Sequence, residues 1–150
     1  MHLKRLPTWT SVALIFAFWA CLSGCGDDRV PTYPASGRVV FPDGSPLPGG
    51  NIEFAPQAGT VKTSARAMIE EDGTFRLTTF RDGDGALAGV HRVAIIPARR
   101  RGQRADEAER SFDGKYQDFE TSGLEATIAS GSPNEFKFVV HPARKSETSR

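Results

Sequence analysis

Short runs of alternating apolar and polar residues, separated by glycine, proline and aspartate, fill most of the chain after residue 35. A period of two is typical of a half-buried β-strand, because successive side chains point to opposite faces of the sheet. No long run with the period of a helix interrupts them. The pattern therefore predicts an all-β sandwich of short strands.

Seven strands are predicted, and their ranges are 37–41, 51–55, 62–70, 74–79, 90–96, 124–129 and 135–141. Alternation in five of them assigns one face to the core. The expected core residues are Val39, Phe41, Ile52, Phe54, Phe75, Leu77, Leu124, Ala126, Ile128, Phe136, Phe138 and Val140.

The dipeptide Asp72-Gly73 lies between two of these predicted strands. Asp-Gly favours a type I′ turn, because both central positions of that turn need positive φ. We therefore expect the two flanking strands to pair antiparallel. Two longer connections, 80–89 and 97–119, exceed the length of a hairpin loop, and the second is expected to hold a helical turn.

The N-terminal segment has a different composition from the rest of the chain. His2, Lys4 and Arg5 precede an apolar run over residues 12–22. This run is shorter than the roughly 20 residues that a membrane-spanning helix needs, but it has the length of a signal-peptide core. It ends in Leu22-Ser23-Gly24-Cys25.

Those four residues resemble the lipidation box of a bacterial lipoprotein signal. The resemblance implies lipid addition to the Cys25 thiol, cleavage between Gly24 and Cys25, and acylation of the new amino terminus. Two or more acyl chains hold a protein stably on a membrane. We therefore expect the mature chain to face the periplasm or the cell exterior, and the box does not distinguish the inner from the outer membrane.

The expected organisation follows from these features. Residues 1–24 are the signal peptide, 25–34 a lipidated polar tether, 35–142 the β-sandwich domain and 143–150 a disordered tail. The tail is polar and cannot bury enough apolar surface to offset the entropy lost on ordering.

Cleavage also narrows the chemistry of the mature chain. Trp9, Trp19 and Cys21 are removed, and Cys25 is occupied by lipid. Seventeen of the 19 basic side chains remain against 18 acidic ones, so a nucleic-acid partner is not expected. The small supply of tryptophan and tyrosine argues against a stacking platform for sugars.

Three motifs follow one another along the predicted domain: the run SGRVVFPDGSPLPGGNIEF over 36–54, DGTF over 72–75, and GALAGVHRV over 85–93. They resemble segments of carboxypeptidase regulatory-like domains, as found in small bacterial lipoproteins, with His91 in place of the usual tyrosine. Lys115-Tyr116, residues 121–124 and residues 134–138 continue the likeness. The resemblance implies a transthyretin-like Greek-key sandwich of seven strands and no catalytic residue.

Candidate catalytic residues are few. Only His91 and His141 survive cleavage; His91 is in phase with Val93 and Ile95 and is expected in the core, whereas His141 is expected to face solvent. Transthyretin-like hydroxyisourate hydrolases carry a C-terminal Y-R-G-S motif, but this chain ends Glu147-Thr148-Ser149-Arg150. No nucleophile with a base and an orienting group is visible, so no enzyme activity is expected.

Two loops offer candidate ligand residues. Asp82 and Asp84 supply two close carboxylates for calcium, which needs six to eight oxygen ligands; a simple Gly-Asp turn also explains them. Arg99, Arg100 and Arg101 suit anionic lipid headgroups or an acidic envelope polymer. The alternative is a solvated loop compensated by nearby acids.

The sequence thus favours a membrane-anchored, non-enzymatic lipoprotein that serves envelope structure or protein interaction, without metal or cofactor. The alternative hypothesis is a binding module for envelope polysaccharide, peptide or calcium. A transthyretin-like hydrolase is the third hypothesis.

Overall fold

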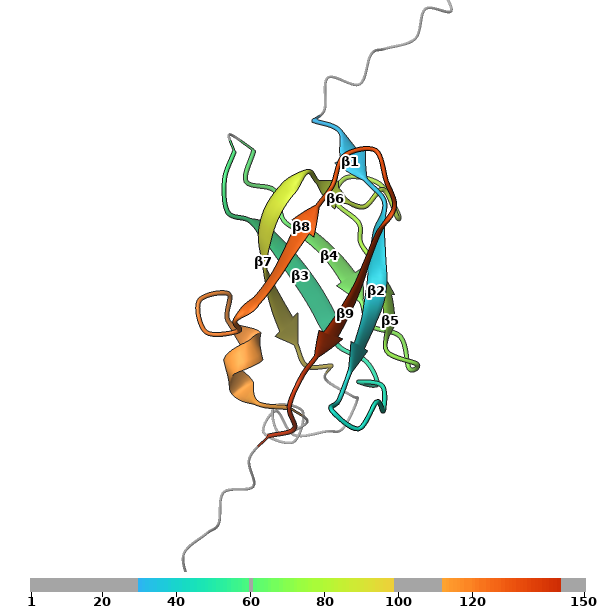
Figure 1. Ribbon diagram of the computed structural model, residues 1–150, viewed down its shortest axis with the longest axis vertical. Helices are drawn as coiled ribbons and strands as arrows, with labels where there is room; N and C mark the ends of the chain where they lie inside the picture. Colours follow the sequence, from blue (N-terminus) through green and yellow to red (C-terminus); the bar gives the residue numbers. More distant parts are fainter. Residues whose placement is uncertain (1–29, 60, 99–111, 144–150) are drawn as a thin grey trace, which may run out of the picture.

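The computed structural model describes residues 30–59, 61–98 and 112–143, and these form an all-β protein (Figure 1). The elements are β1 (Thr32–Tyr33), β2 (Ala35–Val40), β3 (Asn51–Pro56), β4 (Ala65–Met68), β5 (Thr74–Arg76), β6 (Ala86–Leu87), β7 (Gly89–Ile96), the 3₁₀ helix η2 (Gly114–Gln117), β8 (Leu124–Ile128) and β9 (Asn134–Val139).

The strands form three sheets. One has the order β5-β2-β9, a second has the order β4-β3-β7-β8, and β1 pairs with β6. All pairs are antiparallel except β2 with β9, which run parallel. Parallel neighbours need a long crossover, and here nearly the whole domain lies between the two strands.

One apolar core joins the two larger sheets. The ring of Phe54, from β3, lies 6.1 Å from that of Phe75 in β5 and 5.9 Å from that of Phe138 in β9, measured between centroids. Phe136 lies 5.8 Å from the same ring. Tilted and edge-on pairs at these distances are favourable, because the positive edge of one ring meets the negative face of another.

The seven predicted strands all appear, with ends displaced by up to three residues. The predicted core is confirmed as well. Most of its residues are fully buried, and Phe41, Leu124 and Phe136 are half-buried and packed against the rest. The alternating pattern succeeded because burial on one face of a strand constrains every second residue.

The turn at Asp72-Gly73 is not the predicted type I′. Within the described residues positive φ occurs only at glycines, so Asp72 lacks it, whereas Gly73 has φ +81°. The Gly73 N–H donates to the Glu70 carbonyl (2.9 Å) and the Glu70 N–H to the Thr74 carbonyl (2.8 Å). This pattern is that of a longer loop closed by a left-handed glycine.

The flanking strands meet only briefly. Arg66 and Thr78 exchange two 2.9 Å backbone hydrogen bonds in an isolated antiparallel bridge. β4 otherwise pairs with β3, and β5 pairs with β2. The predicted antiparallel pairing is therefore present only at the Arg66–Thr78 bridge, while β4 and β5 themselves belong to different sheets.

Packing begins before the predicted domain start at residue 35. Thr32 pairs with Leu87 and Tyr33 with Ala86, within the segment expected to act as a tether. Gly85 allows this close approach, because a Cβ there would lie 1.8 Å from the Tyr33 carbonyl oxygen. The last residues of the expected tether are therefore part of the fold.

The predicted helical turn in the second long connection is η2. The Asp113 side chain accepts a hydrogen bond from the Lys115 N–H (3.1 Å) and so caps its first turn. Phe112 and Tyr116 are both buried in the core. The Tyr116 hydroxyl also accepts the His141 N–H (3.3 Å), which ties η2 to the segment after β9.

Candidate functional site

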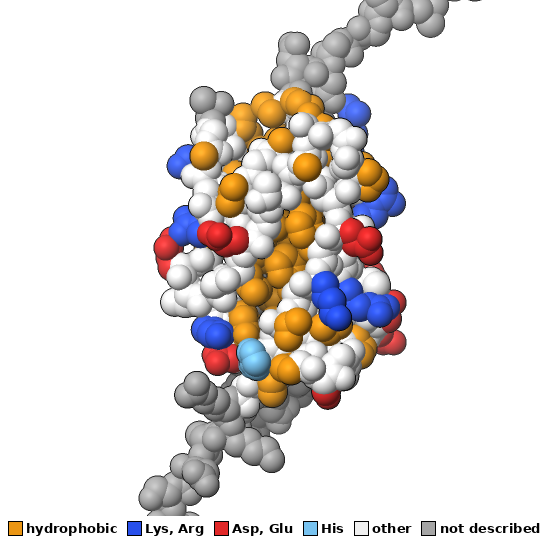
Figure 2. Space-filling model, viewed as in Figure 1, with side chains coloured by type: hydrophobic (Ala, Val, Ile, Leu, Met, Phe, Trp, Pro, Cys, Tyr) orange, Lys and Arg blue, Asp and Glu red, His pale blue; other side chains and the backbone are white. Residues whose placement is uncertain are grey.

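One candidate binding surface lies where the terminal strands of the two larger sheets run beside each other. β8 is the last strand of one sheet and β9 the last strand of the other. We call these two strands, with their half-buried residues Leu124 and Phe136, the β8–β9 edge. A band of hydrophobic side chains is visible over this region in Figure 2.

The backbone of β9 is paired on one side only. The Asn134 N–H donates to the Pro34 carbonyl (3.0 Å) and the Val140 N–H to the Val40 carbonyl (2.9 Å), so even-numbered residues bond to β2. Successive residues of a strand point their polar groups to opposite sides. The N–H and C=O groups of Glu135, Lys137 and Val139 therefore face away from the sheet.

The same argument applies to β8. The Gln57 N–H donates to the Val90 carbonyl (2.9 Å), so the even-numbered residues of β7 bond to β3 and the odd-numbered ones to β8. Within β8 this leaves the backbone groups of Glu125 and Thr127 on the free side. No described strand pairs with either edge.

Asn134 holds the two strands together at one end of the β8–β9 edge. Its Oδ1 accepts the Ala129 N–H (2.8 Å), and its Nδ2 lies 3.2 Å from the Ala129 carbonyl, 3.1 Å from that of Ser132 and 3.2 Å from that of Pro34. Asn134 is itself buried. Away from this residue the strands diverge into their separate sheets.

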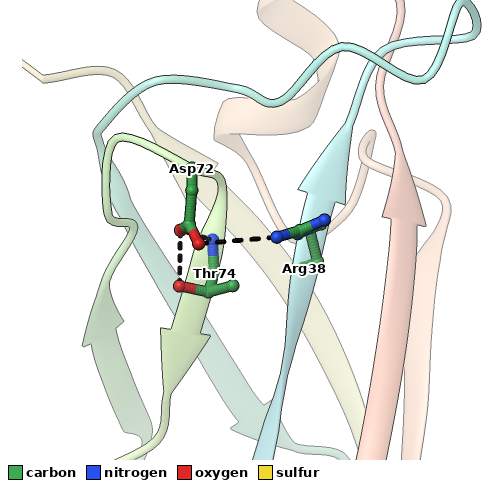
Figure 3. A network of polar contacts seen from close by, with 3 residues as sticks. All are labelled: Arg38, Asp72 and Thr74. Carbon is green, nitrogen blue, oxygen red and sulfur yellow. Dashed lines mark hydrogen bonds and ion pairs between the residues drawn. The ribbon is translucent and has the colours of Figure 1, made fainter.

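A second candidate is an open groove of about 700 Å³ on the β5-β2-β9 sheet. Arg38 and Lys137 stand directly opposite each other there, across β2 and β9. Arg38 also reaches Asp72, at 3.4 Å (Figure 3). Like charges opposite each other repel, which favours an anion between them, but Glu135 also lines the groove and offsets part of this charge.

Asp72 is held by Thr74 as well as by Arg38. The Thr74 hydroxyl and N–H donate to Asp72 Oδ1 at 2.6 and 2.9 Å (Figure 3). These bonds from Thr74 lower the pKa of Asp72, with a smaller contribution from the Arg38 charge. The carboxylate is thus a partner for Arg38 at neutral pH and does not offer a general acid.

His91 lies in the core, as predicted, with only 1% of its surface exposed. Its Nδ1 is 3.1 Å from the Gly89 carbonyl, so the neutral ring carries its proton on Nδ1. Nε2 has no hydrogen-bond partner among the described residues. Burial lowers the pKa of His91, and the Gly89 carbonyl opposes this only in part.

The Asp82 and Asp84 loop is organised by its own backbone. Asp84 Oδ1 accepts the Thr79 N–H (2.7 Å), and Oδ2 accepts those of Phe80 and Arg81, both at 3.0 Å. Burial raises the pKa of Asp84, but these donors outweigh it and the net pKa is lowered. A carboxylate already bonded this way supports the Gly-Asp turn reading over calcium ligation.

The remaining candidates lie outside the described residues. These are Gly24 and Cys25, and Arg99, Arg100 and Arg101. Among residues 30–59, 61–98 and 112–143 there is no group of three or more metal-ligating side chains. Nor does that part of the chain contain a helix with the length and hydropathy to cross a bilayer.

The structure does show where the arginine-bearing segment leaves the domain. β7 begins at Gly89, which pairs with Ile128, and ends at Ile96, just before Ala98. β1 lies beside β6, near the start of β7 (Figure 1). Ala98 and Val30 are thus at opposite ends of the molecule.

Comparison with known proteins adds no assignment. No family model matches the chain, and neither a curated protein nor a solved structure matches it significantly. What is established is a small all-β protein with several mostly antiparallel sheets.

Sequence reasoning missed the β8–β9 edge and the burial of Phe112 and Tyr116. The edge had no local signal, because pairing between β2 and β9 joins residues about 100 positions apart. The burial of Phe112 and Tyr116 did have a local signal, because large apolar side chains in an otherwise polar loop are costly to expose to water.

Proposed function

We propose that the mature chain is a lipoprotein, anchored through acylated Cys25, whose β-sandwich serves protein interaction in the cell envelope. The signal-peptide run and the box Leu22-Ser23-Gly24-Cys25 support the anchor. Removal of residues 1–24 leaves the polar segment before Val30 between lipid and domain.

We further propose that the domain is a transthyretin-like Greek-key sandwich of the carboxypeptidase regulatory-like type. The motifs over 36–54, 72–75 and 85–93 support this. Contacts of the Phe54 ring with Phe75, Phe136 and Phe138 of the other sheet are what two packed sheets require.

The β8–β9 edge carries the interaction part of the proposal. Unpaired N–H and C=O groups on Glu125, Thr127 and Lys137 are ready to bond an added strand, and the half-buried Leu124 and Phe136 offer apolar surface beside them. Strand addition uses these two features together, the first for affinity and the second for specificity. The partner we propose is an extended segment of another envelope protein with alternating apolar side chains.

A catalytic role is not part of the proposal. His91 cannot touch a substrate while its side chain is buried, and its Nδ1 is engaged by Gly89. His141 is exposed and its backbone N–H bonds to Tyr116, an arrangement that supports a structural role.

The anchor is tested by mass spectrometry of the full chain expressed in a bacterium. We expect a mature N-terminus at Cys25 carrying a thioether-linked diacylglycerol, and Cys25→Ser protein that is released or retained unprocessed. A wild-type N-terminus elsewhere, or unmodified Cys25, would refute the lipoprotein assignment.

The edge is tested by removing one outward-facing N–H. Thr127→Pro deletes that donor, whereas Thr127→Val retains it with a similar side-chain shape and β propensity. With a photo-cross-linker at exposed Glu125, on the same strand as Thr127, we expect Thr127→Pro to abolish the adduct of the otherwise wild-type chain and Thr127→Val to preserve it. Both variants must retain the wild-type melting temperature within a few degrees. Equal adducts from both would overturn strand addition.

The groove beside Arg38 and Lys137 supports a second candidate, the binding of an acidic envelope polysaccharide. The two opposed cations are the specific observation in its favour. Calorimetry of the anchored protein in detergent, with an acidic and a neutral glycan, should then show binding of the acidic one only, lost in Lys137→Gln. Lys62→Gln, changed outside the groove, is the matched control.

A further inference from the structure

An apolar surface occupies the end of the domain at which the N-terminal segment arrives. It surrounds a cavity of about 190 Å³. We call it the proximal surface, and its lining residues are Val30, Pro31, Tyr33, Pro56, Ala58, Gly59, Val61, Leu87 and Ala88. Val90 follows Ala88 by two positions. The side chains of Val30 and Val90 are 43% and 44% exposed.

Few charges lie around the proximal surface. In the described segments at this end, 30–35, 56–59, 61–64, 77–90 and 128–134, the basic side chains are Lys62 and Arg81 and the acidic ones Asp82 and Asp84. Arg76 also reaches this end, where it donates to the Gly83 carbonyl (3.3 Å), and Asp84 is bonded to three backbone N–H groups. Charges of both signs are therefore few here, and in the sequence Asp27, Asp28 and Arg29 add a net charge of −1 between Cys25 and Val30.

Chain length decides which surroundings the proximal surface meets. Four residues separate Cys25 from Val30, and the five steps from Cys25 to Val30 span at most about 18 Å when fully extended. Acyl chains on Cys25 would hold this end close to the bilayer. The opposite end is further by the length of β7, whose eight residues span roughly 26 Å.

We infer that the proximal surface docks on the lipid bilayer that holds Cys25, so that the opposite end of the domain, where β7 ends, stands away from the membrane. This inference rests on the proposed anchoring. Docking orients the molecule because lipid anchor and apolar contact act at the same end. The β8–β9 edge then runs away from the bilayer and is open to partners.

The test uses the full lipidated chain in vesicles of phosphatidylethanolamine and phosphatidylglycerol, with lipids brominated on their acyl chains. The mature chain has no tryptophan, so single tryptophans report their own depth. Val90→Trp and Val30→Trp are the probes. Met68→Trp, 67% exposed at the other end, is the matched control.

We expect bromine to quench both probes about twofold or more, as for side chains within 5–10 Å of the acyl boundary, and to leave Met68→Trp unchanged. Protein that floats with the vesicles but shows no quenching of either probe overturns docking while the anchor stands. Equal quenching of all three tryptophans also overturns it. So does a blue shift that grows with protein density without quenching, which identifies a second copy as the occupant. Protein that does not float refutes the anchor itself.

Discussion

The Asn134 side chain bonds both backbone polar groups of Ala129: Oδ1 accepts the Ala129 N–H at 2.8 Å and Nδ2 donates to the Ala129 carbonyl at 3.2 Å. A buried side chain thereby substitutes for a partner strand at the point where β8 ends. The same amide group reaches Pro34, before β2. One residue thus connects both large sheets beside the free edge.

Asn134→Ala should lower the free energy of unfolding by about 2–4 kcal/mol, because several backbone groups lose their partner and at least one stays buried. Urea denaturation measures this loss. Ser132→Ala is the control, since only the Ser132 backbone carbonyl is used. A change below the effect of Ser132→Ala would show that water replaces the amide.

Asp84→Asn should destabilise the 80–89 loop more than Asp82→Asn does. Asp84 accepts three backbone N–H groups, whereas Asp82 is exposed. Because Asp84 is only partly buried, the expected cost is about 1 kcal/mol, and that of Asp82→Asn is within experimental error. Thermal unfolding followed by circular dichroism compares them.

Adding calcium tests whether Asp82 and Asp84 bind a metal ion. We expect calcium to leave the melting temperature of the wild type unchanged, because both Asp84 oxygens are engaged. A rise in melting temperature that depends on Asp84 would restore the calcium hypothesis.

Stability should fall as pH decreases below 6.5 because of His91. Burial lowers the pKa of His91 in the folded protein below the reference value of 6.5, so the unfolded chain binds more protons in the interval between the two. The stabilisation is complete above the unfolded pKa and is lost progressively below it. Urea midpoints between pH 7.5 and 5 measure the slope.

His91→Phe should remove this part of the slope while filling the space beside the Phe54 ring, whose centroid is 6.2 Å away. His141→Gln, at an exposed position, should keep it. The pKa of Asp43, Asp72 and Asp84 is lowered from 3.8, so their losses come at more acidic pH and do not interfere. An unchanged slope in His91→Phe would mean that another group titrates.

Gly85→Ala should cost more than Gly131→Ala. Both glycines have positive φ, at +88° and +90°, so both variants carry a backbone strain of about 1 kcal/mol. Only at Gly85 would the new Cβ also collide with the Tyr33 carbonyl; at Gly131 nothing lies within 4 Å. We expect an additional loss of about 2 kcal/mol for Gly85→Ala. Equal losses would show that β1 moves aside freely.

The strands and the core were predictable from sequence because they depend on a local period. In β8, buried Ala126 and Ile128 alternate with exposed Glu125 and Thr127, and any register that buries one of the two buries the other in phase. His91 followed from the same phase. The position of the turn at Asp72-Gly73 was predicted correctly, but its type was not, because the turn geometry depends on how far the two flanking strands separate.

The sequence by itself therefore determined the all-β class and the core residues. Only the tertiary structure decided which strands end a sheet, that β2 and β9 run parallel, and that Val30 and Ala98 lie at opposite ends. The physical reason is that every strand carries the same backbone donors and acceptors. Which of them pair is decided by the packing of distant side chains, such as Phe54 against Phe138, and not by the local pattern.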